Sequence, residues 1–108
     1  MIKVTLKRND QQLIESFAIS GHANFAKKGA DIVCAGVSAV SFGTVNAIIA
    51  LLSVTPDIEQ GEDGFLRCSI PSDLEESTKE KIQLLLEGMV VSLETIERDY
   101  GNYITISK

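Results

Sequence analysis

The chain has 108 residues, of which 44% are hydrophobic and 23% are charged, and these values are ordinary for a globular protein with one hydrophobic core. Asp and Glu outnumber Lys and Arg by fifteen to ten, which gives a formal net charge of −5 at pH 7. No basic run is longer than a pair, so direct binding of nucleic acid, which needs clustered positive charge, is not expected.

The cysteine content and the apolar runs indicate a cytoplasmic location. The chain has two cysteines and no basic-then-apolar leader, as expected for a protein of a reducing compartment. The longest uninterrupted apolar run, residues 47–52, is too short to cross a bilayer. One histidine with two distant cysteines is a poor ligand set for zinc. We therefore expect no membrane association, no metal and no cofactor.

The first quarter of the chain predicts a β-hairpin followed by a loop. Apolar residues alternate with polar ones over residues 2–7, as in a half-buried strand. A polar turn at residues 9–10 separates them from a second strand over residues 12–19. The chain then enters residues 23–30, which show neither helical nor strand periodicity. Gly21 and Gly29 flank this loop, either as ordinary turn residues or as its flexible ends.

Residues 31–53 have a helical pattern that is apolar on nearly every side. Only Asn46 is conspicuously polar, and no charge follows Asp31. A helix of this kind is expected to be buried. Its many small residues favour close packing against the sheet and against a further surface. A second subunit is one candidate for that surface.

The rest of the chain predicts two short strands, a long helix and a final strand, over residues 57–60, 65–70, 73–98 and 103–107. Ser72 and Glu75 fit a capping box at the start of the helix. Cys68 lies on the apolar face of its predicted strand, and this pattern identifies it as a small core residue.

These elements follow the order β-β-α-β-β-α-β. We expect an α+β fold, a two-layer sandwich of a mixed, mostly antiparallel sheet with two long helices. Residues 1–108 are expected to form a single domain.

The start of the first helix predicts a reactive cysteine. Asp31 is a preferred N-cap residue, so Cys34 is the third helical position, among unpaired amides at the positive end of the helix dipole. This environment stabilises the thiolate, which is the nucleophilic form of cysteine. The only histidine, His22, lies twelve residues earlier across the loop, where it can fold back as the base. The amides of the helix start are candidate donors to an oxyanion.

Two neighbours of this site have alternative interpretations. Asp31 is either a helix cap alone or a third group that orients the imidazole or meets a substrate cation. Ser38 lies one turn after Cys34 on the same helix face, which fits either a residue lining the site or a small packing residue. Phe25 in the loop is either an exposed aromatic residue or a cover over the site.

Three segments of the sequence resemble a known family. They are GHA at residues 21–23, G-x-DIVCAGVSAV at 29–40 and FGTVNAI at 42–48, and VSLETIERDY at 91–100 extends the likeness into the last helix. The chain resembles the ribosomal-processing cysteine protease family Prp over nearly its whole length.

The resemblance implies a homodimeric cytoplasmic cysteine endopeptidase. Its substrate would be a large-subunit ribosomal protein precursor, whose N-terminal extension is removed after an aromatic motif. Cys34 would be the nucleophile and His22 the general base of a dyad that works through an acyl-enzyme, in a loop that orders around substrate. Gly21, Asp31 and Ser38 would be supporting or substrate-binding residues. A usually basic ribosomal protein also suits the acidic chain.

Two other functions remain compatible with the residues alone. In a non-enzymatic ribosome-assembly or ribosome-associated module, Cys34 and His22 would be packing and loop residues. In a thiol acyltransferase or redox protein, Cys34 would react without cutting peptides. A redox role would need a resolving cysteine, and Cys68 is badly placed on a core face.

Overall fold

The computed structural model describes residues 1–27, 30–62 and 64–108. Within them the chain forms two helices and five strands in the order β-β-α-β-β-α-β. The helices are α1 (Ile32–Leu52) and α2 (Glu76–Tyr100), and the strands are β1 (Ile2–Arg8), β2 (Ile14–Ser20), β3 (Asp57–Gln60), β4 (Leu66–Ser69) and β5 (Ile104–Ser107).

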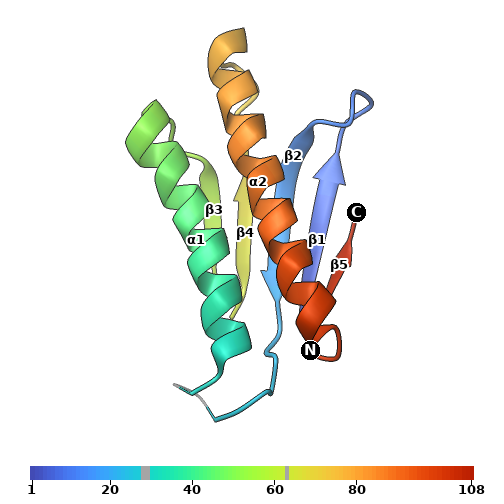
Figure 1. The fold of residues 1–108 in the computed structure, drawn as a ribbon. Coiled ribbons are helices and arrows are strands. Elements are labelled where there is room, and N and C mark those ends of the chain that lie inside the picture. The colour runs from blue at the N-terminus through green and yellow to red at the C-terminus, as the bar shows by residue number, and fades with distance from the viewer. Residues whose placement is uncertain (28–29, 63) are drawn as a thin grey trace.

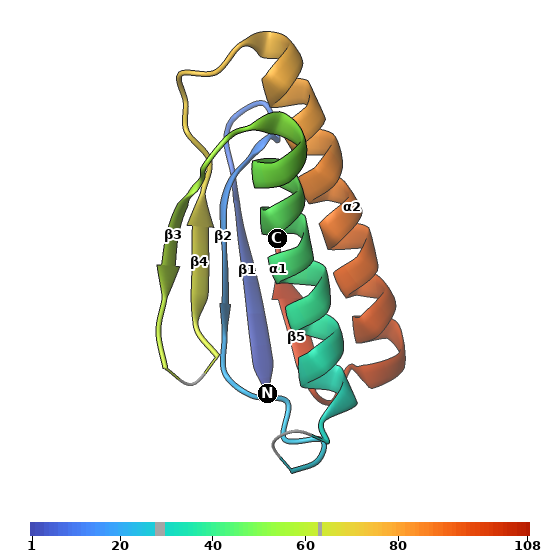
Figure 2. The same cartoon turned by 90° about the vertical axis from the view of Figure 1, so that its left-hand side faces the viewer.

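The strands form one mixed sheet in the order β3-β4-β2-β1-β5. β1 and β5 are parallel, whereas the other neighbouring pairs are antiparallel. Both helices lie side by side along the same face of this sheet (Figure 1), and the view from the side separates one helical layer from one sheet layer (Figure 2). The predicted α+β two-layer sandwich with a mixed, mostly antiparallel sheet is confirmed.

The core lies between the two layers. Ile2, Val4 and Leu6 are buried and alternate with exposed residues along β1, as the period of a strand with one solvated face requires. From the helical layer, α2 contributes Ile82, Leu86 and Leu93, which have no exposed surface. Alternation in the strands and three- and four-residue spacing in the helix therefore predict the core correctly.

Helix α1 is buried on one side only. Its sheet-facing side holds Val33, Val37, Ser41, Val45 and Ile48, but its outer side is exposed in the single chain. The prediction of a helix buried on nearly all sides is therefore wrong for the isolated chain, because the sheet and α2 cover a single face. With 21 residues and a mean hydropathy of 1.9, α1 is long and apolar enough to cross a membrane by length and composition alone. Core helices of soluble proteins pass the same test. One side of α1 packs into the hydrophobic core of this chain.

Helix α2 begins later than the sequence predicts. The predicted range was residues 73–98, but the helix runs over Glu76–Tyr100, and its N-cap Glu75 makes no side-chain capping hydrogen bond. The capping box of Ser72 and Glu75 is therefore wrong. Leu74 packs against the hydrophobic core from the non-helical segment before the helix, and this tertiary contact overrides the local capping preference. The helix ends at Tyr100, two residues after the predicted end.

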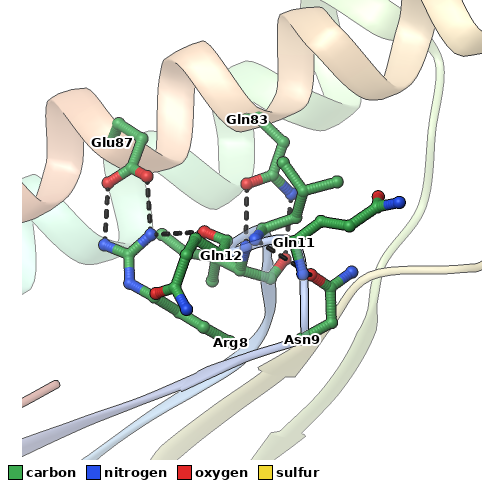
Figure 3. Close-up of polar contacts among 8 residues, drawn as sticks. Arg8, Asn9, Gln11, Gln12, Gln83 and Glu87 are labelled. Atoms are coloured by element: carbon green, nitrogen blue, oxygen red, sulfur yellow. Dashed lines mark hydrogen bonds and ion pairs between the residues drawn. The ribbon is translucent and has the colours of Figure 1, made fainter.

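Two side chains of α2 hold the β1–β2 hairpin against the helical layer (Figure 3). Gln83 accepts from the amide of Ile14 and donates to its carbonyl, both at 2.9 Å, so it serves as a backbone-like partner where the sheet ladder ends. One turn later, Glu87 accepts two hydrogen bonds from the Arg8 guanidinium, at 2.7 and 2.9 Å. This fork-to-fork pairing fixes both distance and orientation.

Replacing Glu87 with Gln keeps the shape of the side chain and removes its charge. We expect the free energy of unfolding at neutral pH to fall by about 1 kcal/mol, the scale of a charge-assisted hydrogen-bonded pair that solvent partly screens. The hydrogen bonds from Arg8 lower the pKa of Glu87, so this stabilisation is present above the ordinary carboxyl pKa of about 4.3 and is lost as the pH falls through the lowered value. Urea unfolding of both proteins from neutral to acid pH measures the difference. A difference that does not shrink in acid would contradict this account.

Candidate active site

The candidate site lies at the end of the molecule where β2 ends and α1 begins. The start of β1 and the turn between β3 and β4 lie at the same end (Figure 2). Between these segments is an open cavity of about 640 Å³. Its lining includes all five residues that the sequence analysis selected, namely Gly21, His22, Asp31, Cys34 and Ser38.

Asp31 caps α1 and also holds the loop. One carboxylate oxygen accepts from the amides of Val33 and Cys34, both at 3.0 Å. The other oxygen accepts from the amides of Phe25 at 3.0 Å and Ala26 at 3.4 Å. The hydrogen bond from the Cys34 amide is the main reason that the pKa of Asp31 lies below its usual range, and the loop amides lower it further. The predicted cap is confirmed, and the second oxygen adds a role that the sequence did not indicate.

The cap changes which groups can stabilise an oxyanion. The amides of Val33 and Cys34 donate to the Asp31 side chain, and the amide of Ala35 donates to the Asp31 carbonyl. The expectation that the amides of the helix start are available to an oxyanion is therefore wrong for these three, because Asp31 already accepts from all of them.

Cys34 is the third residue of α1, as predicted, and its side chain is partly buried. The amide of Ala23 donates to its sulfur at 3.4 Å. The residue directly after His22 thus contacts the thiol through its backbone, so the loop folds back onto the helix start. Ser38 lines the same cavity one turn further along the exposed side of α1. Of its two interpretations, the structure favours the site-lining one.

His22 follows a glycine in a conformation that side chains rarely adopt. Gly21 has φ of 86°, and a Cβ there would lie 2.4 Å from the Met1 carbonyl oxygen. Only glycine fits this close approach. On the other side, Gly64 of the β3–β4 turn comes close to both residues, since a Cβ there would lie 2.9 Å from the Gly21 carbonyl oxygen and 3.7 Å from Cε1 of His22.

Phe25 anchors the loop to the other end of the chain. Its ring packs edge-on against Tyr103 with centroids 5.1 Å apart and against Tyr100 at 5.7 Å, a favourable aromatic geometry. Its neighbours Asn24 and Ala26 line the cavity. Phe25 stays 39% exposed, so the structure agrees with the interpretation of an exposed aromatic residue, which here also packs on two tyrosines. Gly29, the other predicted loop end, lies outside the described residues.

Seven residues that line the cavity were not predicted as site residues from the sequence, and three of them lie outside the strands and helices. Asn24 and Ala26 belong to the loop, and Gly64 belongs to the β3–β4 turn. Asn24 has a positive φ of 56°, which asparagine tolerates better than most residues, but the sequence does not indicate where its side chain lies. Gly64 is recognisable as a turn residue, yet only the pairing of β2 with β4 brings that turn to the site.

The second cysteine belongs to the core, as predicted. Cys68 has no exposed surface, and burial raises the pKa of its thiol to about 11. It is therefore protonated and inert at neutral pH. In the part of the chain that the structure describes, no group of three or more His, Cys, Asp or Glu side chains is placed to hold a metal ion.

Comparison with known proteins identifies the class of enzyme. The family described as "Cysteine protease Prp" matches residues 1–105, so the class of protein is a cysteine protease. The chain belongs to this Prp family, which confirms the resemblance found in the sequence.

Its relatives and structural neighbours are similar over almost their full length. The ribosomal processing cysteine protease Prp of Bacillus subtilis is 49% identical over 99% of this chain and 96% of the relative. That of Staphylococcus aureus strain Mu50 is 42% identical over 99% and 98%. A crystal structure of the S. aureus protease with a covalently linked product peptide superposes with a TM-score of 0.90, at 40% identity and over 99% and 98% of the two chains. A second one, with a substrate peptide, gives 0.83 at 39% identity over the same shares.

Replacing Asp31 with Asn tests its double role. The amide keeps one acceptor oxygen for the helix or the loop, but its nitrogen cannot accept for the other. We expect the backbone amides on one of the two sides to exchange with solvent several-fold faster, with the loop amides of Phe25 and Ala26 the more sensitive because their segment has less other support. Hydrogen exchange followed by NMR measures this at single residues. Unchanged exchange at Phe25, Ala26, Val33 and Cys34 would contradict the bridging role.

Proposed function

We propose that this cysteine protease removes the N-terminal extension of a large-subunit ribosomal protein precursor, cutting after an aromatic motif. Cys34 is the nucleophile and His22 the general acid and base. The observation that carries this proposal is the shared cavity, in which the thiol of a capped helix start and the only imidazole of the chain line one open space. The names of the relatives support the ribosomal substrate, and the family resemblance supports the aromatic motif.

Two features beside Cys34 can stabilise negative charge that develops on its sulfur during the reaction. The sulfur lies in the first turn of α1, where the helix dipole is positive, and it accepts from the Ala23 amide. Both effects stabilise negative charge on sulfur. The carboxylate of Asp31 opposes them, but its four backbone donors hold it and spread its charge. His22 as an imidazolium would complete the stabilisation of the thiolate.

In the first half of the reaction, the Cys34 thiolate attacks the carbonyl carbon of the scissile bond. A carbon–sulfur bond forms, and the carbonyl electrons move onto oxygen. When the tetrahedral intermediate collapses, the carbon–nitrogen bond breaks and His22 protonates the leaving amine. The mature protein departs, while the extension stays on Cys34 as a thioester. A covalently linked product peptide on the S. aureus relative is consistent with such an intermediate.

In the second half, His22 removes a proton from water, and the hydroxide attacks the thioester. The carbon–sulfur bond breaks, the extension leaves with a free carboxylate, and the thiol is restored. Gly21, Asp31 and Ser38 support these steps rather than carry them. Asp31 fixes the helix start and the loop, and Ser38 lies on the cavity wall where a peptide passes.

The decisive experiment is a digest of the extended ribosomal protein precursor, read by mass spectrometry. We expect one discrete cut after an aromatic residue with the unchanged protein. The rate should fall about a thousandfold or more in Cys34→Ala and in His22→Ala, since each removes a participant of the chemistry. Cys68→Ala is the matched control, because it removes the other thiol from the core and should keep the cut despite lower stability.

Two outcomes would refute the proposal. A precursor that stays intact with the unchanged protein would refute the substrate, and full cleavage by Cys34→Ala would refute the nucleophile. The non-enzymatic module predicts an intact precursor in every digest. An acyltransferase predicts rapid alkylation of Cys34 without hydrolysis. Membership of a protease family already favours cleavage over both.

We also propose that the enzyme works in the cytoplasm as a homodimer, without binding nucleic acid or a membrane. Two free cysteines and a ribosomal substrate suit the cytoplasm, and the net charge of −5 disfavours nucleic acid. The outer side of α1 supports the dimer. It exposes Phe42, Ile49 and Leu51 and, after Asp31, carries no charged residue. An uncharged apolar helix face is suited to pack against a second copy of itself.

Placing a charge on this face tests the dimer. We expect Phe42→Glu to shift the protein from dimer to monomer in analytical ultracentrifugation, because dimerisation would bury an unpaired carboxylate. Leu84→Glu on the exposed side of α2 is the control, since this leucine is 75% exposed and lies outside the proposed interface. A monomeric unchanged protein would refute the dimer, and a dimer sensitive only to Leu84→Glu would move the interface to α2.

A further inference from the structure

We propose that Gly64, in the turn between β3 and β4, is a positioning residue for the imidazole of His22. The inference rests on the proposed function, because it assigns to the turn the task of holding the general base in place. Gly64 is separated from His22 by more than forty residues of sequence, and it lines the same cavity as His22 and Cys34.

The backbone of Gly64 lies against Gly21, the residue before the base. A Cβ at Gly64 would lie 3.7 Å from Cε1 and 3.9 Å from Nδ1 of His22, and 2.9 Å from the Gly21 carbonyl oxygen. The first two values are ordinary van der Waals contacts, whereas the third is closer than real side chains approach a backbone oxygen. Gly64 also has φ of 74°, in the region that glycine adopts freely. The turn therefore approaches the Gly21 carbonyl with no room for a side chain, and the imidazole of His22 lies within van der Waals reach of the place that a Cβ would take.

The register of the sheet explains this close approach. β2 and β4 pair with Ile19 opposite Leu66. Two residues further along the antiparallel ladder, beyond the last paired positions, Gly21 falls opposite Gly64. A glycine on both sides of this position lets the two backbones approach, and the ring of the next residue, His22, fits beside them.

A second close approach holds Gly21 from the other side. A Cβ on Gly21 would lie 2.4 Å from the Met1 carbonyl oxygen. The end of β2 is thus enclosed between the start of β1 and the β3–β4 turn. Because both neighbours lie just before strands of the sheet, they fix the backbone from which the imidazole extends. A general base displaced by about 1 Å loses much of its effect, so this enclosure bears on catalysis.

Two substitutions at Gly64 separate the close approach to Gly21 from backbone strain. Gly64→Ala introduces both a Cβ and an unfavourable φ, whereas Gly64→Asn introduces the Cβ in a residue that tolerates the left-handed region. Gly61→Ala is the matched control in the same turn. Its Cβ would meet only the Phe65 side chain, at 3.5 Å, and Gly61 is outside the left-handed region.

Two measurements report on the site without any substrate. His22 is the only histidine, so the imidazole gives a single set of ¹⁵N and ¹³C signals by NMR, which a general loss of stability would not move in the folded protein. The rate of Cys34 alkylation by iodoacetamide is the second, with the buried thiol of Cys68 as internal reference. We expect both Gly64 variants to shift the imidazole signals and to slow alkylation by about tenfold or more. Gly61→Ala should match the unchanged protein.

Two results would overturn the inference. Imidazole signals and alkylation rates that are the same in all four proteins would overturn the inference. Changes in Gly64→Ala alone, with Gly64→Asn unaffected, would also overturn it, since strain rather than the close approach would then be the cause. Failure of the proposed function looks different, because the expected NMR changes would appear in a protein that cleaves no precursor.

Discussion

The carboxylate of Asp31 is the interaction on which the candidate site depends. Four backbone amides from two segments converge on its two oxygens. One pair begins α1 and thereby sets Cys34 in the first helical turn, and the other pair holds the loop that carries Ala23 back to the thiol. Because these amides lower its pKa, Asp31 stays ionised at neutral pH and keeps all four bonds. A single side chain thus joins the helix of Cys34 to the loop that follows His22.

The same carboxylate sets a limit on the chemistry. A negative charge beside the start of α1 offsets part of the helix dipole that would otherwise favour the thiolate. It also occupies the amides nearest to Cys34. The thiol therefore draws its hydrogen bond from outside the helix, from Ala23. The loop thus supplies the hydrogen bond to the Cys34 sulfur that the capped helix does not supply. The position of the loop and the reactivity of Cys34 are therefore linked in this proposal.

The sheet supplies the second half of the site. His22 follows the last residue of β2, and the backbone before it is enclosed between Met1 and Gly64. These contacts come from three different strand ends, which the pairing of the strands brings to the same end of the sheet (Figure 2). His22 thus extends from the sheet layer and Cys34 from the helical layer, and the cavity lies where the two layers meet at their ends.

The sequence by itself determined the features that depend on near neighbours and on periodicity. Asp31 caps the helix because its acceptors and donors are two and three residues apart, and Cys68 is a core residue because strand alternation places it there. The tertiary structure alone decided the contacts between distant segments. The second oxygen of Asp31, the aromatic partners of Phe25, the start of α2 after Leu74 and the place of Gly64 beside His22 all arise from packing or strand register. These interactions join residues that local rules treat as independent, so only the folded chain could bring them together.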